Sequence, residues 1–521
     1  MATLSPPRTA AWMTRRRRPA REIGLLVVAG IIALALLSPL ALVALDAHSA
    51  GWGEIHRTLF RARSVMLLRH TVVLAAIVAV AAALLGTGTA WLTERAALPA
   101  RRLWTVLLVL PVAVPDFVVS YAWHSFAPRI PSLLGASIVM TLGTYPLVYL
   151  PVAAALRRAD PSMEEAAHSL GVGRVATFRR VTLPLVRTAI IGGCVLVVLT
   201  VISEFGAFEI LGYQTFTTEI FTEFQFDARA AGSLAIPLVL LGLAVLLAEG
   251  LLPGRTVAGS APRRAVRPVR LRRMTVPAMA GLGALVVLAV GVPVGTIVYW
   301  MAAAQQTTLP AAATLTSATL TTLSYSAAGA AAAVVLALPV ALISLRRSTV
   351  PRTVLERSTY LTKALPGVVI ALSLVFFATR YAFGLYETST LLVVAYVILN
   401  FPLALVCVKA SVAHVPPRLT DVGRSLGRGP VAVFVRVTLP LLAPGLLAGF
   451  CLVFLTAVTE LTATLVLAPI GVQTLATQFW AFQQNIAYSA AAPYALVMLA
   501  LAVIPGTLLG LWFDRERSTR A

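Results

Sequence analysis

Long apolar segments constrain this chain more than any other feature of its sequence. Roughly twelve runs of about 20 apolar residues occur, which is the length at which a helix crosses a bilayer. Because 59% of the 521 residues are hydrophobic and 12% are charged, too few polar residues remain to cover a water-soluble globule. The sequence predicts an all-α, polytopic membrane protein with helices near 23–45, 67–93, 103–124, 135–156, 187–210, 231–252, 275–301, 320–345, 364–385, 390–413, 441–464 and 491–513.

The distribution of basic residues predicts the topology. The apolar run Gly24–Leu45 is too long for a signal-peptide core, so we interpret it as a retained first membrane helix after a basic N-terminal segment, residues 1–22. With that segment in the cytoplasm, 35 of the 42 arginines and lysines fall on the cytoplasmic side. The net charge of +22 is therefore a topology signal and does not indicate a nucleic-acid partner. Both termini, including the tail 514–521, are expected in the cytoplasm of a bacterial cell with the chain embedded in its inner membrane.

A polar, basic segment at 160–185 is repeated at 416–441. Between Ser169–Leu185 and Ser425–Leu441, 13 of 17 positions are identical at a constant offset of 256 residues. Such a match indicates an internal repeat. We expect two tandem six-helix halves, 23–252 and 275–513, joined by an Arg-rich cytoplasmic linker, 253–274, and related by a pseudo-twofold axis along the membrane normal.

Each repeated segment has helix-capping and helix-breaking residues at positions that predict two short helices separated by a break. Asp160 is a candidate N-cap, and Gly171 and Gly427 are candidate left-handed helix stops. The second short helix is expected to end where Pro184 or Pro440 blocks it. We interpret each segment as a compact surface for another protein.

The segment Glu165-Ala166-Ala167, followed after three residues by Gly171, resembles the EAA signature of binding-protein-dependent ABC importer permeases with the MetI-like fold of type I importers. The resemblance implies that the loop is a coupling helix seated in a dimeric ATPase subunit, with Glu165 and Asp421 pairing with arginines of that subunit. Alternatively, these acids are solvated residues favoured by the helix dipole. The candidate docking residues are Glu165, Ala166, Ala167, Ser169, Leu170, Gly171, Asp421, Gly423, Ser425, Leu426 and Gly427.

The chain itself lacks the sequence of an ATPase. A P-loop needs a lysine after a Gly-rich turn, and neither Lys363 nor Lys409 follows one. We therefore expect a transport permease that is not an enzyme and binds no cofactor, with ATP used by the partner subunit. The three cysteines lie in apolar runs and predict neither disulfides nor a metal site.

One acidic block, between Glu204 and Asp227, is expected to face the outside with Arg229 as its single nearby cation. Carboxylate and phenolate oxygens suit hard cations such as Fe(III). The block is therefore either a substrate path or a polar rim that contacts a substrate-binding protein, and no metal site is assigned. The candidate residues are Glu204, Glu209, Tyr213, Glu219, Glu223 and Asp227, with Glu460 in the second half and Asp116 inside the third helix.

The stretch GYQTFTTEIF in the first half, with ELTATLVLAP and QTLATQFW in the second, resembles fused permeases of ferric-iron importers. The resemblance implies iron as the substrate, with thiamine or phosphonate as alternatives. A secondary transporter driven by an ion gradient would predict broken helices and buried carboxylates, of which the sequence offers mainly Asp116. A membrane scaffold without transport would leave the repeated segments unexplained.

Overall fold

A computed structural model of the chain describes residues 20–518 except for 161, 252–268, 305–307, 345–360, 414, 417, 418, 420, 421 and 424. Over these residues the protein is helical, and the only β-type pairing within them is a parallel bridge between Ala96 and Val269. The expected all-α class is confirmed for this part of the chain.

The first half contains a long series of helices. They are α1 (Ala20–Ala50), α2 (Trp52–Leu59), α3 (Ala62–Arg95), α4 (Arg101–Val109), α5 (Asp116–Phe126), α6 (Ser132–Thr144), α7 (Pro146–Arg158), α8 (Ser162–Ser169), α9 (Arg174–Thr177), α10 (Leu183–Ser203), α11 (Gly206–Ile210), α12 (Phe216–Phe226) and α13 (Ala228–Leu251).

The second half repeats this series. Its helices are α14 (Thr275–Val286), α15 (Val292–Ala303), α16 (Ala312–Ser344), α18 (Gly367–Tyr381), α19 (Ser389–Ala413), α21 (Pro430–Val433), α22 (Leu439–Val458), α23 (Thr462–Leu467), α24 (Leu475–Gln484) and α25 (Tyr488–Ser518). Short π turns η2 (Phe178–Thr182), η4 (Val287–Gly291) and η7 (Phe434–Thr438) join consecutive helices, as do the 3-10 turns η1 (Leu110–Ala113), η3 (Arg272–Met274), η5 (Thr362–Ala364) and η6 (Phe383–Leu385).

Nine helical segments among the described residues are long and apolar enough to cross a membrane. A tenth crossing is a bent pair of helices, and two further apolar helices, Gly367–Tyr381 and Tyr488–Val503, are shorter. Together these segments account for the twelve expected runs, so the protein is a multi-pass membrane protein.

The third crossing of the first half is broken, which corrects the expectation of one continuous helix over 103–124. The axes of Arg101–Ala113 and Asp116–Phe126 differ by 92°. Pro115 explains the break, because a proline disfavours the helical conformation of the residue before it, and Val114 is extended. In the second half Pro366 occupies the same place before α18, between η5 and Gly367.

The two halves also share a local structure after their fifth crossing. Thr215 and Thr474 each cap the following helix in a reciprocal capping box. A threonine from another helix, Thr71 of α3 or Thr322 of α16, lies beside each capped end. The Phe216 N–H donates to Thr71 Oγ1 at 3.4 Å, and the Leu475 N–H donates to Thr322 Oγ1 at 2.8 Å. The repeat therefore extends from the sequence to side-chain contacts.

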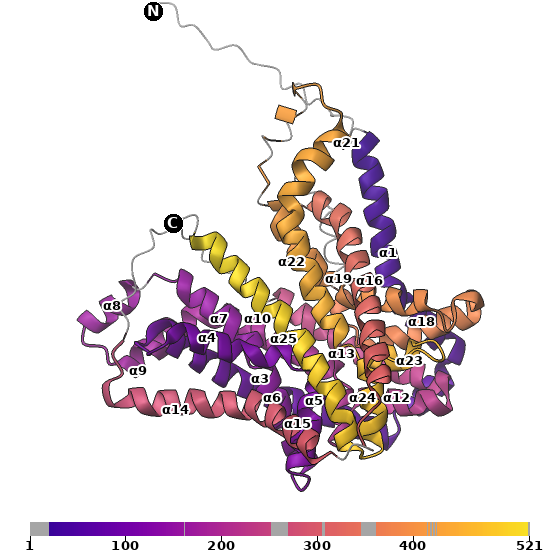
Figure 1. Cartoon of the computed structure of the whole chain (residues 1–521), viewed down its shortest axis with the longest axis horizontal. Helices are drawn as coiled ribbons and strands as arrows, with labels where there is room; N and C mark the ends of the chain where they lie inside the picture. The colour runs from indigo at the N-terminus through magenta and orange to yellow at the C-terminus, as the bar shows by residue number, and fades with distance from the viewer. Residues whose placement is uncertain are drawn as a thin grey trace, which may run out of the picture.

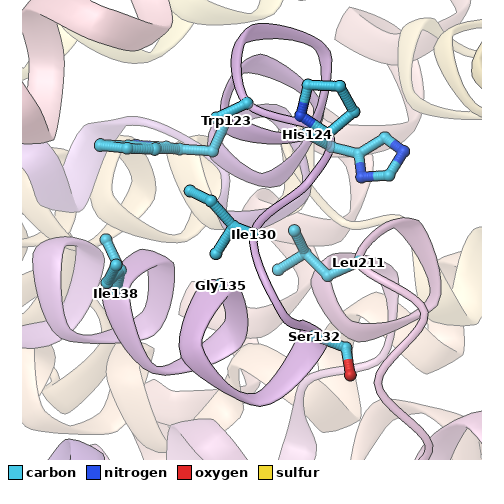
Figure 2. Close-up of a pocket in the computed structure, with 9 residues that line it drawn as sticks. Trp123, His124, Ile130, Ser132, Gly135, Ile138 and Leu211 are labelled. Atoms are coloured by element: carbon cyan, nitrogen blue, oxygen red, sulfur yellow. The ribbon is translucent and has the colours of Figure 1, made fainter.

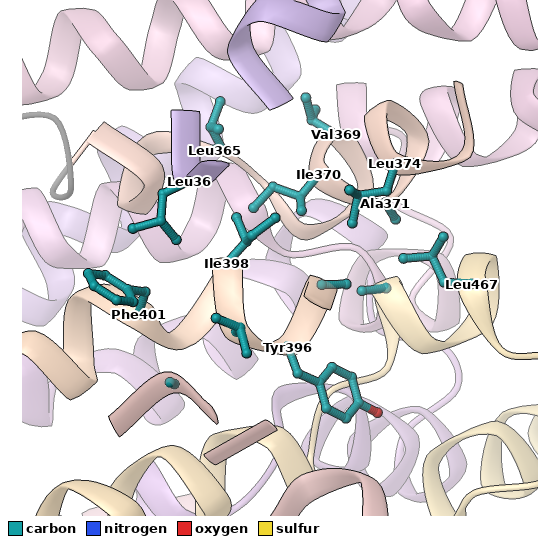
Figure 3. Packing of buried hydrophobic residues seen from close by; sticks show 14 of the residues in the cluster. Leu36, Leu365, Val369, Ile370, Ala371, Leu374, Tyr396, Ile398, Phe401 and Leu467 are labelled. Carbon is teal, nitrogen blue, oxygen red and sulfur yellow. The ribbon is translucent and has the colours of Figure 1, made fainter. Parts of the chain in front are cut away.

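The first helix of each half packs against the other half. Helix α1 contacts α16 and α18 of the second half (Figure 1). Figure 3 shows Leu36 of α1 within a buried cluster that contains Leu365, Ile370 and Phe401. In the opposite direction α14 and α15 lie against α4 and α5, with Leu282 in the core of the first half. The two halves are therefore interleaved.

Beyond this exchange the helices form two diverging arms. In Figure 1 helices α3, α7 and α10 extend to the left toward α8 and α9, whereas α16, α19 and α22 extend upward toward α21. The arms meet at the lower right, near α5, α12 and α24. The two repeated polar segments thus lie at the ends of different arms.

Candidate functional site

The first polar loop is built as the sequence predicts at its helix ends. Asp160 Oδ1 accepts the Ser162 N–H at 2.9 Å and so caps α8. Gly171 has a φ of +78°, and the N–H of Val172 reaches back to the Ala167 carbonyl at 3.0 Å. This arrangement is a glycine-dependent helix stop.

The second polar loop repeats the stop. Gly427 has a φ of +72°, and the Arg428 N–H donates to the Gly423 carbonyl at 3.2 Å. Asp421, the predicted counterpart of Glu165, lies outside the described residues.

Several of the predicted docking residues are exposed at both loops, whereas Ala167 is half-buried and Gly423 is buried. Leu170 and Leu426, which occupy equivalent positions in the two loops, are 82% and 75% exposed. Glu165 is exposed as well, as are Ser169 and Ser425. The acidic residue that contacts the rest of the protein is instead its neighbour, Glu164.

The expectation that Pro184 and Pro440 end the second short helix is wrong. Val175–Ser203 and Val431–Val458 are each one long helix that passes through its proline. A π turn precedes the proline in both cases, at η2 and η7. Because a π turn shifts the hydrogen-bond register, it can accommodate a residue without an N–H. Each polar loop is consequently continuous with a membrane-crossing helix.

The expectation that the acidic block has Arg229 as its single nearby cation is also wrong. Glu219, whose side chain is 6% exposed, accepts hydrogen bonds from Arg63 at 2.5 and 2.6 Å. Arg61 lies 2.9 Å from Glu223 and 3.3 Å from Glu219. Two of the candidate carboxylates are therefore neutralised by arginines that precede or begin α3, about 160 residues earlier in the chain.

The other candidate residues of the acidic block, Tyr213, Glu209 and Asp227, have different surroundings. Tyr213 is buried, its ring stacks on His70 at 5.3 Å, and its hydroxyl donates to the His70 carbonyl. Glu209 lies in the connection between two crossings, where burial raises the pKa of its carboxyl. Asp227 is exposed beyond α12. Within the described residues no group of three or more His, Cys, Asp or Glu is arranged to hold a metal ion.

Glu204 and Glu460, by contrast, lie at equivalent places where the two halves meet. Glu204 Oε1 accepts the Ala207 N–H at 2.8 Å, and Glu460 Oε1 accepts the Ala463 N–H at 3.0 Å. A Cβ added to Gly206 would lie 2.7 Å from Leu461 Cδ2, so the segments that follow the two glutamates touch across the halves. Both side chains are half-buried and each has a second carboxylate oxygen beyond its capping contact.

Asp116 and one residue that sequence reasoning missed complete this group. A Cβ added to Gly206 would lie 3.0 Å from Phe117 Cβ, so the segment after Glu204 packs on the start of α5, where Asp116 lies. A Cβ added to Gly367 would lie 3.5 Å from Glu460 Oε1, so Glu460 lies beside the segment that connects Lys363 to α18. Lys363 lies three residues before Pro366, as Val112 lies three residues before Pro115, and both side chains are exposed, so no sequence signal marks this lysine as part of the group. We call Asp116, Glu204, Lys363 and Glu460 the charged junction.

The charged junction has features that a gradient-driven transporter would also have. The third crossing of the first half is a broken helix, and Asp116 begins the part of it that follows the break. Broken helices and carboxylates within the bundle therefore do not distinguish a gradient-driven transporter from an ATP-driven one in this chain.

Aromatic side chains pack across the halves beside the charged junction. Phe117 and Tyr121 contact Phe479 at ring-centroid distances of 5.4 and 5.2 Å, and Phe205 contacts Trp480 at 5.4 Å. These five residues, which we call the aromatic junction, belong to one buried cluster built from both halves. The aromatic junction holds the arms together where they meet.

A small cavity of about 160 Å³ lies between the end of α5 and the start of α6. Figure 2 shows Trp123, His124, Ile130 and Leu211 around it. None of the predicted site residues lines this cavity, so it is separate from the charged junction.

Comparison with known proteins identifies the family. Residues 82–252 and 329–516 match the family described as binding-protein-dependent transport system inner membrane component. The chain is 35% identical over 502 residues to the Fe(3+)-transport system permease protein FbpB 2 of Haemophilus influenzae, covering 95% of this chain and 98% of that protein.

More distant relatives include proteins with different substrates in their names. The ferric transport system permease protein FbpB of Actinobacillus pleuropneumoniae is 22% identical, covering 88% of this chain and 72% of that protein. The sulfate transport system permease protein CysT of Salmonella typhimurium is 27% identical, covering 47% of this chain and 98% of that protein. With its two matched segments and a relative similar over nearly its whole length, the chain belongs to the binding-protein-dependent transport system inner membrane component family.

Proposed function

We propose that this chain is the membrane subunit of an ATP-driven importer and that its substrate is ferric iron. The observation that carries the proposal is the 35% identity over 95% of the chain to a Fe(3+)-transport permease. The interleaved halves supply both sides of a translocation path in one polypeptide. A substrate-binding protein outside the membrane and an ATPase dimer in the cytoplasm are the partners that this function requires.

The two polar loops dock the ATPase in this proposal. They lie at the ends of different arms, expose Leu170 and Leu426, and continue into membrane-crossing helices. A dimeric ATPase has two equivalent clefts, so closure of the dimer would draw the two loops together. Glu165 and Asp421 would each face a cation of the ATPase, fixing the register of the contact. Both loops and both chain termini are then cytoplasmic.

Closure of the ATPase dimer would move the two arms and open the path alternately to the two sides of the membrane. The arms diverge on the side of the polar loops and meet at the aromatic junction (Figure 1), which is the arrangement of a path closed to the outside. Bringing the loops together would pivot the arms and separate Phe117 and Phe205 from Phe479 and Trp480. The binding protein would deliver its substrate to the opened outer face.

The charged junction supplies the chemistry for a ferric path. Fe(III) is a hard cation that prefers oxygen donors, and Glu204 and Glu460 present carboxylates from both halves with Asp116 nearby. Lys363 reduces the negative charge of the group, which favours passage over permanent binding. Iron would pass from one carboxylate to the next and would not rest in a closed coordination cage.

The test uses proteoliposomes that contain the full transporter and a loaded binding protein. Substitutions Glu204→Gln and Glu460→Gln keep an oxygen that accepts the backbone N–H and remove the charge. We expect ATP-driven uptake of radioactive iron to fall by about tenfold, the equivalent of losing one interaction of about 1.4 kcal/mol. Glu209→Gln, outside the charged junction, is the matched control and should retain uptake. Unchanged iron uptake in both junction variants, or uptake of sulfate in place of iron, would contradict the proposed substrate path.

A further inference from the structure

Arg95 ends α3 on the side of the polar loops and is almost completely buried. Its residue exposure is 1%, and its Nε lies 3.3 Å from Glu164 Oε2 in the first turn of α8. Glu164 Oε1 accepts a second hydrogen bond from Thr182 Oγ1 at 2.9 Å, at the end of the π turn that leads into α10. One carboxylate on the first polar loop therefore binds two membrane-crossing helices.

The backbone at Arg95 holds a third part of the chain. The Val269 N–H donates to the Arg95 carbonyl at 2.7 Å, and the Ala97 N–H donates to the Val269 carbonyl at 3.0 Å. The end of the segment that joins the halves is thus pinned to the same residue as α8. This contact shows that the expected linker is anchored at its C-terminal end.

The buried guanidinium depends on Glu164. Arg95 Nη2 has no hydrogen-bond partner within the described residues, so Glu164 is the anion that balances its charge there. A buried charge that loses its partner is strongly destabilised, whereas a neutral pair is tolerated. The ion pair is therefore a fixed connection between α3 and α8 and differs from an exposed surface contact.

The second half cannot form this ion pair at the corresponding position. At the repeat offset of 256 residues, Thr438 matches Thr182, but Thr420 stands where the first half has Glu164. Among the described residues of the second loop, Gly423 instead packs closely against the Val433 side chain. The first loop is held by charge and the second, as far as the structure describes it, by apolar contact.

We propose that Glu164 and Arg95 are positioning residues that clamp the first polar loop to α3 and α10, so that force applied to α8 moves these helices as one body. The second loop lacks this clamp and follows its arm with more freedom. The inference rests on the proposed function, in which α8 receives the ATPase. It assigns to Glu164, which is turned toward the protein, a role distinct from that of the exposed Glu165.

The first experiment tests the clamp without the ATPase. In a chain whose three cysteines are replaced by alanine, a nitroxide label is placed at Leu170 or at its counterpart Leu426. Glu164→Thr, which copies the second half, should increase the mobility of the label at Leu170 and leave the label at Leu426 unchanged. Equal mobility at Leu170 with and without the substitution would overturn the clamp.

The second experiment measures coupling in the reconstituted transporter. Glu164→Gln should still co-purify with the ATPase, but iron uptake per ATP hydrolysed should fall by about three- to tenfold. Should that variant fail to fold, the neutral pair Arg95→Gln with Glu164→Gln removes the unbalanced charge and decides the question by the same readout. Unchanged uptake per ATP would overturn the inference, whereas absence of ATP-driven uptake in the wild type would instead overturn the proposed function.

Discussion

At the scale of single residues, Glu219 and Glu223 of the acidic block serve the fold more than they could serve a binding site. Glu219 is buried against Arg63 and Arg61, whereas Glu223 pairs with Arg61 and has 24% of its side chain exposed. A carboxylate held in this way cannot release its arginines to bind a cation without losing stability. The ion pairs instead fasten α12 to the start of α3.

This reading predicts that Glu219→Gln destabilises the protein more than Glu223→Gln does. Because both arginines are partly exposed, we expect a loss of about 1–2 kcal/mol for Glu219 and less than about 1 kcal/mol for Glu223. Thermal unfolding of the purified chain in detergent measures the difference. Equal midpoints for the two variants would contradict the assignment.

Residue contacts of this kind could not be predicted from the sequence. The acidic block suggests a substrate path or a rim for a binding protein because Arg61 and Arg63 lie far from it along the chain, and only the fold brings them to Glu219. Glu204 and Glu460 were found by the repeat, which gives position but not orientation. The place of Lys363 near Glu460 could not be predicted, because it depends on the break in the helix at Pro366.

At the scale of elements, the sequence predicts helix stops at glycines better than it predicts whether a helix bends or continues at a proline. The positive φ of Gly171 and Gly427 follows from their place after a short helix. The bend at Pro115 and the passage of a helix through Pro184 did not follow, since a proline can either break a helix or be accommodated by a π turn. Packing on both sides of the proline decides the outcome.

The glycine stop gives a prediction for the first polar loop. An alanine at Gly171 would meet no atom within 4 Å, so its cost is the strain of a left-handed backbone, about 1 kcal/mol. That strain would fray α8 and weaken ATPase binding by about fivefold in a titration with purified ATPase.

Gly173 provides the matched control for this prediction. It too has open space around an added Cβ, but its φ is not positive, so Gly173→Ala should bind the ATPase as the wild type does. Equal binding by both alanine variants would show that the stop does not shape the docking surface.

At the scale of the whole molecule, the ion pairs of the described residues form two separate groups. Arg61 and Arg63 pair with acids of the acidic block, whereas Arg95 pairs with Glu164 beside the first polar loop. Arg101 and Arg157 both bind Glu94 in that second group. The number of crossings and the duplication were accessible from hydropathy and repeats. The packing of each half's first helix against the other half could not be predicted from the sequence, because an apolar helix face does not specify which bundle it joins.

The central claim is that the polar loops transmit work from a separate ATPase to the path between the arms. Its most direct test compares iron uptake into proteoliposomes that contain this chain with and without the ATPase and binding protein. We predict uptake only with all three components and hydrolysable ATP, and none from a proton or sodium gradient. Accumulation of iron by this chain alone, driven by a gradient in the absence of nucleotide, would contradict the claim.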